Sequence, residues 1–179
     1  VEYAQKNCMF NKKLFIYLSK THLFIYYKEL NQPLRIEFEP TTLQDLERIN
    51  TEWISAKLDA LLEKINLKNA VAVLILSKDL VFDKIVNEES LEEKFRETND
   101  FIEHIPLPSN VVVYKEFIKD DNTLITATCR DVYEVMIELF KEHEVTIESV
   151  LPEIVFNKID FSKSFLYDLF KQKELLEFG

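Results

Sequence analysis

Apolar residues near the start of the chain fall into three short runs. KLFIYLS (13–19) and HLFIYYK (22–28) are apolar and aromatic, and a short turn separates them, as in a β-hairpin. The next run, LRIEFEP (34–40), alternates apolar with charged residues, which is typical of a half-buried strand. The pattern therefore predicts a three-stranded meander.

The spacing of apolar residues then changes to that of a helix. Thr41-Thr42-Leu43-Gln44 has the form of a capping box, which often begins a helix. We therefore expect one long helix over 42–66. Its apolar face would consist of Leu43, Leu46, Ile49, Trp53, Ile54, Leu58, Leu61, Leu62 and Ile65.

The middle of the chain returns to strands. AVAVLILS (70–77) is almost wholly apolar, as expected of a central strand buried on both faces, and 80–86 alternates like a second strand. Ser90-Leu91-Glu92-Glu93 is another capping box and predicts a helix to about residue 105, where prolines follow. The residues expected to face inward on that helix are Leu91, Phe95, Phe101 and Ile102.

The last third predicts a hairpin, a helix, a strand and a final helix. The hairpin covers 111–119 and 123–129. Asp131 is expected to cap a helix over 132–144, a strand follows at 145–151, and residues 160–178 form an amphipathic helix. The stripe expected on the 132–144 helix is Val132, Val135, Met136, Leu139 and Phe140.

This order of elements predicts an α+β fold, with helices packed on one large mixed sheet or on two adjacent sheets. We expect three parts, with a seam near 66–69. They are a meander with its long helix (12–68), a ββαββαβ interaction module (69–156) and a C-terminal amphipathic helix (157–179).

Charge and composition narrow the functional classes. The chain has 179 residues, 47% of them hydrophobic, and a formal net charge of −10. An acidic chain is a poor match for nucleic acid, whose binding needs clustered basic residues. Its two cysteines, Cys8 and Cys129, cannot form a disulfide framework, which favours a reducing compartment. No run approaches the roughly 20 apolar residues of a membrane span.

The scarcity of glycine argues against nucleotide binding and catalysis. The one glycine is Gly179, so no glycine-rich phosphate loop or hydrolase elbow is present. The three histidines, His22, His104 and His143, lack partners at metal-ligand spacing. A nucleophilic pair of Cys129 with His104 is left open, although no motif recommends it. We therefore expect no metal, no cofactor and no catalytic residue.

The stretch from Leu74 to Pro152 resembles the inserted subdomain of the actin-like proteins PilM and FtsA. The resemblance lies in the order of elements and in two segments, FIEHIP (101–106) and IESVLPE (147–153). A looser similarity covers 12–156. It implies an actin-like architecture in shortened and degenerate form.

The resemblance also assigns roles to the first hairpin. In the family, an acidic residue and a glycine near the end of the first strand serve Mg-nucleotide. Here those positions fall at Tyr17 and Ser19. Tyrosine cannot hold the water shell of a divalent ion as a carboxylate does, and serine blocks a close backbone approach. The resemblance therefore implies a relative that has lost ATP binding.

The tail, FSKSFLYDLFKQKELLEF (161–178), carries aromatic residues and lysines at helical spacing. This pattern is typical of a membrane-surface helix or of a segment that docks on a partner. Two alternatives are that the helix packs on the domain's own sheet, and that a transmembrane segment follows it. The residues expected to contact a partner or membrane are Phe161, Phe165, Leu166, Leu169 and Phe170.

Together these features predict a non-catalytic scaffold for protein–protein interaction. By resemblance to PilM, it would lie in the cytoplasm, at the inner membrane. It would serve a type IV pilus or type II secretion assembly and bind a short segment of a membrane partner, with peripheral membrane contact and a homo-oligomer left open. The alternative is a small α+β enzyme or ligand-sensing domain whose pocket is built from non-consecutive residues.

Overall fold

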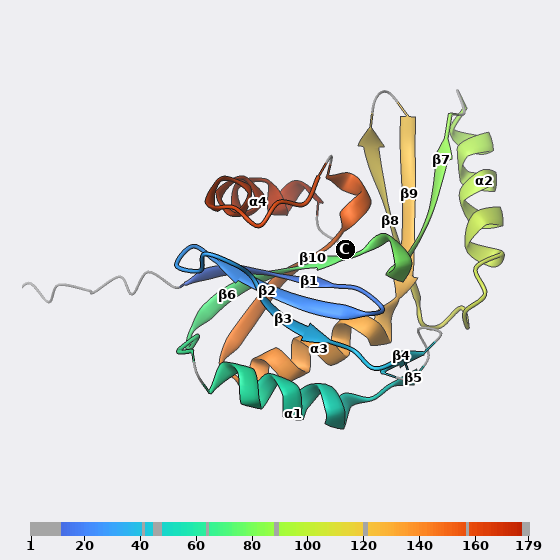
Figure 1. Cartoon of the computed structure of the whole chain (residues 1–179). Coiled ribbons are helices and arrows are strands. Elements are labelled where there is room, and N and C mark those ends of the chain that lie inside the picture. The colour runs from blue at the N-terminus through green and yellow to red at the C-terminus, as the bar shows by residue number, and fades with distance from the viewer. Residues whose placement is uncertain are drawn as a thin grey trace, which may run out of the picture.

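The computed structural model describes residues 12–40, 42–44, 48–63, 65–87, 90–119, 122–156 and 158–176. Within them the protein is α+β, with helices packed on two main sheets and one short two-stranded ladder. The two main sheets stand next to each other and at an angle (Figure 1). The fold class expected from the sequence is confirmed, with two adjacent sheets rather than a single large one.

The first sheet has five strands in the order β10-β6-β1-β2-β3. The predicted meander is its antiparallel half, made by β1 (Lys13–Leu18), β2 (His22–Tyr27) and β3 (Leu34–Glu37). β6 (Ala70–Leu76) pairs in parallel with β1, and β10 (Val145–Pro152) pairs in parallel with β6. The carboxyl ends of β1, β6 and β10 therefore meet at one edge of the sheet.

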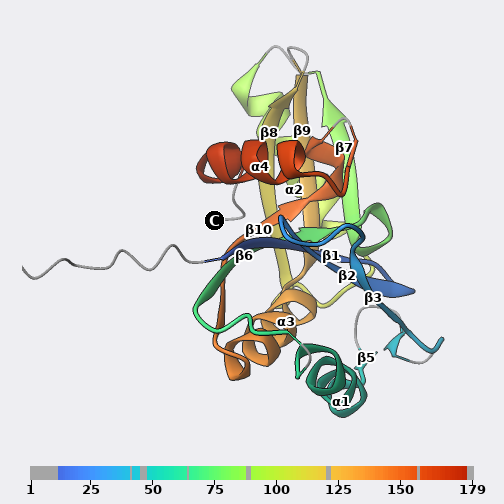
Figure 2. The ribbon, with the colours of Figure 1, turned by 60° about the vertical axis from the view of Figure 1, so that its left-hand side comes forward.

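Helices cover both faces of this sheet. α1 (Thr51–Leu62) and α3 (Arg130–Glu142) lie on one side and α4 (Lys163–Leu176) on the other (Figure 2). Because side chains alternate along a strand, β1 sends Leu14 and Ile16 into the larger core and Phe15 toward α4. Every residue of β6 except Val71 is buried, so the prediction of a strand buried on both faces is confirmed.

The predicted long helix over 42–66 is wrong. β4 (Leu43–Gln44) pairs with β5 (Arg48–Ile49), and α1 begins only after Asn50, whose side chain accepts a hydrogen bond from the Trp53 amide at 3.1 Å. Leu43 is buried in the larger core. Apolar residues of the short ladder and of the helix that follows face the same core, so their spacing along the chain resembled that of one continuous helix. Thr41 and residues 45–47 lie outside the described residues.

The second sheet has three strands in the order β7-β9-β8. After the short 3-10 turn η1 (Lys78–Leu80), β7 (Val81–Val86) pairs with β9 (Asn122–Cys129), which pairs with β8 (Val112–Lys119). α2 (Leu91–Glu103) packs along it, on the side away from α4 (Figure 1). We call the unit of β7, α2, β8 and β9 the inserted unit.

The boundary of the inserted unit differs from the expected module of 69–156. The first and last strands of that module, β6 and β10, pair within the five-stranded sheet. Periodicity marks a strand but does not say which strand it joins. The expected division into three parts stays a prediction. The short 3-10 turn η2 (Glu153–Val155) and α4 complete the chain.

Two helix starts test the capping predictions. The Ser90 hydroxyl accepts from the Glu93 amide at 3.2 Å and donates to the Glu93 carboxylate at 2.6 Å, which confirms Ser90 as the cap of this helix. The Asp131 cap is wrong, because α3 begins at Arg130 and Cys129 takes the cap position. The extended backbone of β9 runs directly into the helix, so Asp131 falls in the first turn of α3 and not before it.

The inward face of α2 is only partly as expected. Phe101 and Ile102 are half-buried, but Leu91 and Phe95 are 86% and 69% exposed, and Thr98 is the buried residue of the helix. Two ion pairs, Lys84–Glu97 and Lys94–Glu116, add to the contacts between α2 and the sheet. A helix that rests on a narrow three-stranded sheet can bury only one stripe, which leaves part of its apolar face uncovered.

Candidate functional site

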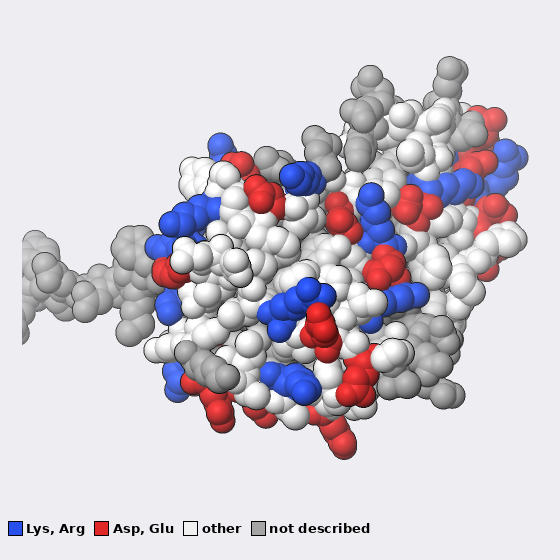
Figure 3. All heavy atoms as spheres, in the orientation of Figure 1, with Lys and Arg blue, Asp and Glu red and all other residues white. Residues whose placement is uncertain are grey.

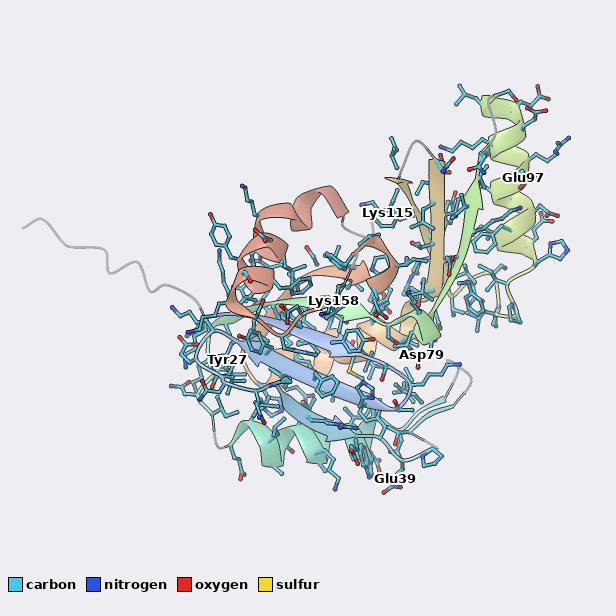
Figure 4. The ribbon with its side chains drawn as sticks, turned by 45° about the horizontal axis from the view of Figure 1, so that its top comes forward. Tyr27, Glu39, Asp79, Glu97, Lys115 and Lys158 are labelled. Carbon is cyan, nitrogen blue, oxygen red and sulfur yellow. The ribbon has the colours of Figure 1, made fainter. Side chains whose placement is uncertain are left out.

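The carboxyl ends of β1, β6 and β10 bring three turns together. β1 supplies Tyr17, the β1–β2 turn supplies Lys20, η1 supplies Asp79, and η2 supplies Glu153. Figure 4 shows Asp79 where the five-stranded sheet meets the inserted unit. Ligands commonly bind outside the carboxyl ends of such strands, so this cluster, which we call the turn cluster, is the first candidate site.

Two carboxylates of the turn cluster bind backbone amides. The Lys20 amide donates to Asp79 Oδ2 at 3.0 Å, and the Lys78 amide donates to Glu153 Oε2 at 3.0 Å. The Tyr17 hydroxyl also donates to Glu153 Oε2 at 3.0 Å, and the Ser77 hydroxyl donates to Asp79. The chain's own carboxylates thus bind two backbone amides at the carboxyl edge of the five-stranded sheet.

Ser19 binds the remaining amides of the β1–β2 turn. Its hydroxyl oxygen accepts from the Thr21 amide at 3.3 Å and from the His22 amide at 3.1 Å, and the side chain is buried. Together with Asp79 on the Lys20 amide, side-chain oxygens satisfy three consecutive amides. The Ser19 side chain therefore closes the turn on itself.

Burial shapes the titration of two rings beside this turn. Burial, and next the charge of Glu153, raise the pKa of Tyr17 well above its usual range, so the phenol stays protonated as a donor. The His22 ring stacks on Tyr17 with 6.1 Å between centroids, and its Nδ1 lies 2.7 Å from Thr21 Oγ1. Burial, and next the charge of Arg35, lower the pKa of His22. Both rings are therefore uncharged at neutral pH.

The turn cluster is poorly suited to metal or phosphate chemistry. Among the described residues, no group of three or more His, Cys, Asp and Glu side chains could hold a metal ion. The backbone amides of the turn cluster already donate to oxygen atoms of the protein. The carboxylates of Asp79 and Glu153 would repel a phosphate. What the arrangement can do is hold β1, β6 and β10 together at their carboxyl ends.

The inserted unit offers a second candidate site. Lys94 of α2 pairs with Glu116 of β8 at 2.6 Å, and Thr98 also faces Glu116. Because side chains alternate, Tyr114 and Ile118 lie on the same face of β8 as Glu116, at 49% and 90% exposed. β8 is an edge strand, since it pairs with β9 alone.

Exposed apolar residues on α2 and on the edge strand β8 flank, along the sequence, the two members of the pair Lys94–Glu116. Phe95 and Leu91 of α2 are one helical turn apart, and both are exposed. We call Leu91, Phe95, Tyr114 and Ile118 the α2–β8 strip. Exposed apolar surface that gathers in one place marks interaction sites more often than scattered residues do.

The tail residues predicted to contact a partner or membrane face the protein's own sheet. Phe15 of β1 lies 5.5 Å from Phe161 and 5.3 Å from Phe165 between ring centroids. Leu166 and Leu169 are buried in the same cluster, and Phe170 packs at its edge. The structure therefore shows the alternative in which the C-terminal helix packs on the domain's own sheet. Contact of these five residues with a partner or membrane stays a prediction and would require α4 to leave the sheet.

The other singled-out residues are engaged in local structure. Cys129 is buried, whereas His104 ends α2 with its Nδ1 2.7 Å from the Asp100 carbonyl. His143 follows α3 and lies 3.2 Å from Asp59. Sequence reasoning missed Asp79 and Glu153 as site residues. The signal available was their position directly after two buried strands, where parallel strands bring residues together.

Comparison with solved structures identifies the class of fold. The chain superposes on the PilM-PilN type IV pilus biogenesis complex with a TM-score of 0.52 and 13% identity, over 78% of this chain and 46% of the other. The second structure is the cytoplasmic domain of EpsL, an inner membrane component of the type II secretion system of Vibrio cholerae. Its TM-score is 0.48 and its sequence identity 10%, over 80% of this chain and 58% of the other. The third structure is a Bacteroides thetaiotaomicron protein with an actin-like ATPase fold. Its TM-score is 0.43 and its sequence identity 13%, over 76% of this chain and 51% of the other.

These likenesses show the fold alone. The chain spans about half the length of each of these neighbours. No protein-family model and no curated protein matches the sequence. In the part of the chain that the structure describes, no helix is long and apolar enough to cross a membrane.

Proposed function

We propose that this protein is a non-catalytic docking component of an inner-membrane assembly of the type IV pilus or type II secretion kind. It would lie at the cytoplasmic face and hold an extended segment of a membrane protein. The observation that carries the proposal is the β1–β2 turn, where Ser19 and Asp79 bind three consecutive amides. The fold of the PilM-PilN complex, a complex of two proteins in pilus biogenesis, supports the setting.

The closed turn favours docking over ATP hydrolysis. Nucleotide loops bind phosphates through free backbone amides and flexible glycines. Here a phosphate would have to displace a serine and a carboxylate and then sit beside the charges of Asp79 and Glu153. The alternative, an enzyme or ligand sensor, needs a deep cleft with convergent polar groups, whereas the turn cluster directs its polar groups at one another.

The α2–β8 strip is the surface that best fits such a segment. An extended peptide can add a strand to an open edge, gaining main-chain hydrogen bonds from the strand and specificity from side-chain contacts. β8 supplies the edge, and Phe95, Tyr114 and Ile118 supply apolar contacts on one side of it. We infer that the bound segment would lie on the inserted unit, which falls within the stretch that resembles the inserted subdomain of PilM and FtsA.

Nucleotide titration tests the closed turn. We expect calorimetry to detect no saturable binding of Mg-ATP up to about 1 mM, a weak-binding limit near −4 kcal/mol. A variant with Asp79→Ala and Glu153→Ala removes the two charges, and Lys141→Ala on α3 serves as a matched surface control. Saturable binding by the native protein that Ser19→Val abolishes, with the fold retained by circular dichroism, would contradict the proposal.

Site-specific cross-linking tests the docking surface. A photo-reactive phenylalanine at Phe95 or Ile118 should cross-link in living cells to an inner-membrane assembly protein. The same residue at exposed Glu138 on α3 should not. Because both strip positions are exposed, the label should not disturb the fold. Cross-links from Glu138 but from neither strip position would refute this surface.

A further inference from the structure

A hollow of about 700 Å³ lies between α4 and the end of the five-stranded sheet where β1 begins and β2 ends. The volume falls within the range of ligand-binding pockets, about 300–1,000 Å³. We call it the lysine hollow. Its lining consists of Lys12, Lys13, Lys28, Glu29, Lys163, Leu166, Tyr167, Phe170 and Lys171.

The charge of the lysine hollow is opposite to that of the protein. Five lysines and one glutamate line it, although the chain as a whole carries a net charge of −10. Figure 3 shows basic side chains along the left-hand end of the molecule, where β1 begins. Like charges held this close repel one another, and a bound anion relieves that repulsion.

Most of these lysines have no carboxylate partner among the described residues. Lys28 alone is paired, with Glu29 at 3.7 Å. Lys12 donates to the Asn66 carbonyl at 2.6 Å, and Lys13 lies 5.1 Å from the centre of the Phe170 ring. Lys163 and Lys171 extend from α4 with no ion pair to a described carboxylate.

Apolar side chains form the floor between the lysines. Leu166 is buried, Phe170 is half-buried, and Tyr167 stands at the rim with 70% of its surface exposed. Lysine stems add further apolar surface beneath their charged ends. A ligand that fits must therefore carry both negative charge and an apolar group.

We propose that the lysine hollow binds an acidic peptide segment with a large apolar side chain, whose carboxylates pair with the lysines while the apolar side chain contacts Leu166 and Phe170. The site lies at the opposite end of the sheet from the turn cluster and does not involve the α2–β8 strip. It is therefore a second docking site and does not depend on the proposed function.

The position of the apolar residues favours a peptide over a bilayer. A surface that inserts into a membrane carries its apolar side chains outermost, with basic residues behind them at the level of the headgroups. Here Leu166 is buried and the lysines surround it. Inorganic phosphate would satisfy the lysines but leave the floor exposed to water.

Fluorescence anisotropy with a defined probe tests this site. The probe is a labelled hexapeptide in which two acidic residues flank each side of a Leu-Phe pair. Lys163→Glu with Lys171→Glu should weaken its binding at least about tenfold, because both charges reverse beside the ligand. Lys57→Glu with Lys141→Glu makes the same charge change on α1 and α3, on the other face of the sheet, and should weaken binding less than about twofold.

Two altered probes separate the charged from the apolar contribution. A probe with glutamine at all acidic positions should lose binding. A probe with alanine in place of Leu-Phe should bind several-fold more weakly. The protein variant Tyr167→Ser should bind the original probe several-fold more weakly as well. Equal binding of all three probes would overturn the proposal. Equal weakening by the α4 pair, Lys163→Glu with Lys171→Glu, and by the control pair would also overturn it. So would displacement of the probe by millimolar inorganic phosphate, or binding at these lysines by vesicles containing phosphatidylglycerol and not by the probe.

Discussion

The five-stranded sheet and the inserted unit use their apolar residues in opposite ways. β6 is buried on both faces by helices. In the inserted unit, one buried threonine and two ion pairs, Lys84–Glu97 at 2.5 Å and Lys94–Glu116 at 2.6 Å, connect α2 to the sheet; Figure 4 labels Glu97 on α2. Of the six exposed large hydrophobic residues in the described part of the chain, five lie in this unit: Ile85, Leu91, Phe95, Tyr114 and Ile118.

This difference separates stability from recognition. Apolar surface already buried in the five-stranded sheet lowers the free energy of folding and offers little to a partner. Apolar surface exposed on the inserted unit contributes little to folding and is free to be buried on binding. We therefore expect substitutions in the two regions to affect different measurements.

Truncation of a core leucine should have the largest effect. Leu74→Ala removes a side chain that is fully buried in β6 and should lower the free energy of unfolding by about 2–5 kcal/mol. Phe95→Ala on α2 should change it by less than about 0.5 kcal/mol, while it weakens partner binding. Urea unfolding measures both, and an equal loss for the two variants would remove the distinction between the regions.

Loss of an ion pair in the inserted unit should have an intermediate and local effect. Glu116→Gln weakens the pairing with Lys94, whose side chain is 28% exposed, and should cost up to about 1 kcal/mol. Hydrogen exchange should accelerate in α2 and leave the five-stranded sheet unchanged.

The pair Lys68–Glu144, with side chains 69% and 52% exposed, provides the control for that measurement. Lys68→Gln should alter neither the free energy of unfolding nor the exchange of α2, because an exposed pair contributes little. Faster exchange throughout the five-stranded sheet after Glu116→Gln would show that the two regions unfold as one.

Protonation of His22 should have the smallest effect and should appear in the five-stranded sheet. Its pKa in the folded protein is lowered, chiefly by burial, so below about pH 6.5 the unfolded chain binds the proton more readily. Stability should therefore decrease as the pH falls from about 7.5 to about 5.5.

The variant His22→Phe keeps the aromatic contact with Phe24 and should reduce this pH dependence, as measured by the urea midpoint at the two pH values. The matched variant is His104→Gln on α2, whose side chain is exposed; it should leave the dependence in place. If removal of His104 has the larger effect, the assignment to His22 is wrong.

Local patterns were sufficient for most elements of the fold. The three strands of the meander, the buried strand β6 and the helix cap at Ser90 follow from spacing and cap residues alone, because each depends on neighbours in the sequence. The helix expected over 42–66 failed because the Asn50 cap and the β4–β5 ladder broke a continuous apolar pattern.

The chain by itself also determined that the turn after β1 has no glycine, which argues against a phosphate loop. It did not determine that the oxygens of Ser19 and Asp79 bind the turn amides, since Asp79 is distant in sequence and reaches the turn only because β1 and β6 are parallel neighbours. Likewise the pattern identified α4 as amphipathic, but only packing showed that its aromatic face meets Phe15. Periodicity records which residues avoid water, whereas the tertiary structure decides which surface covers them.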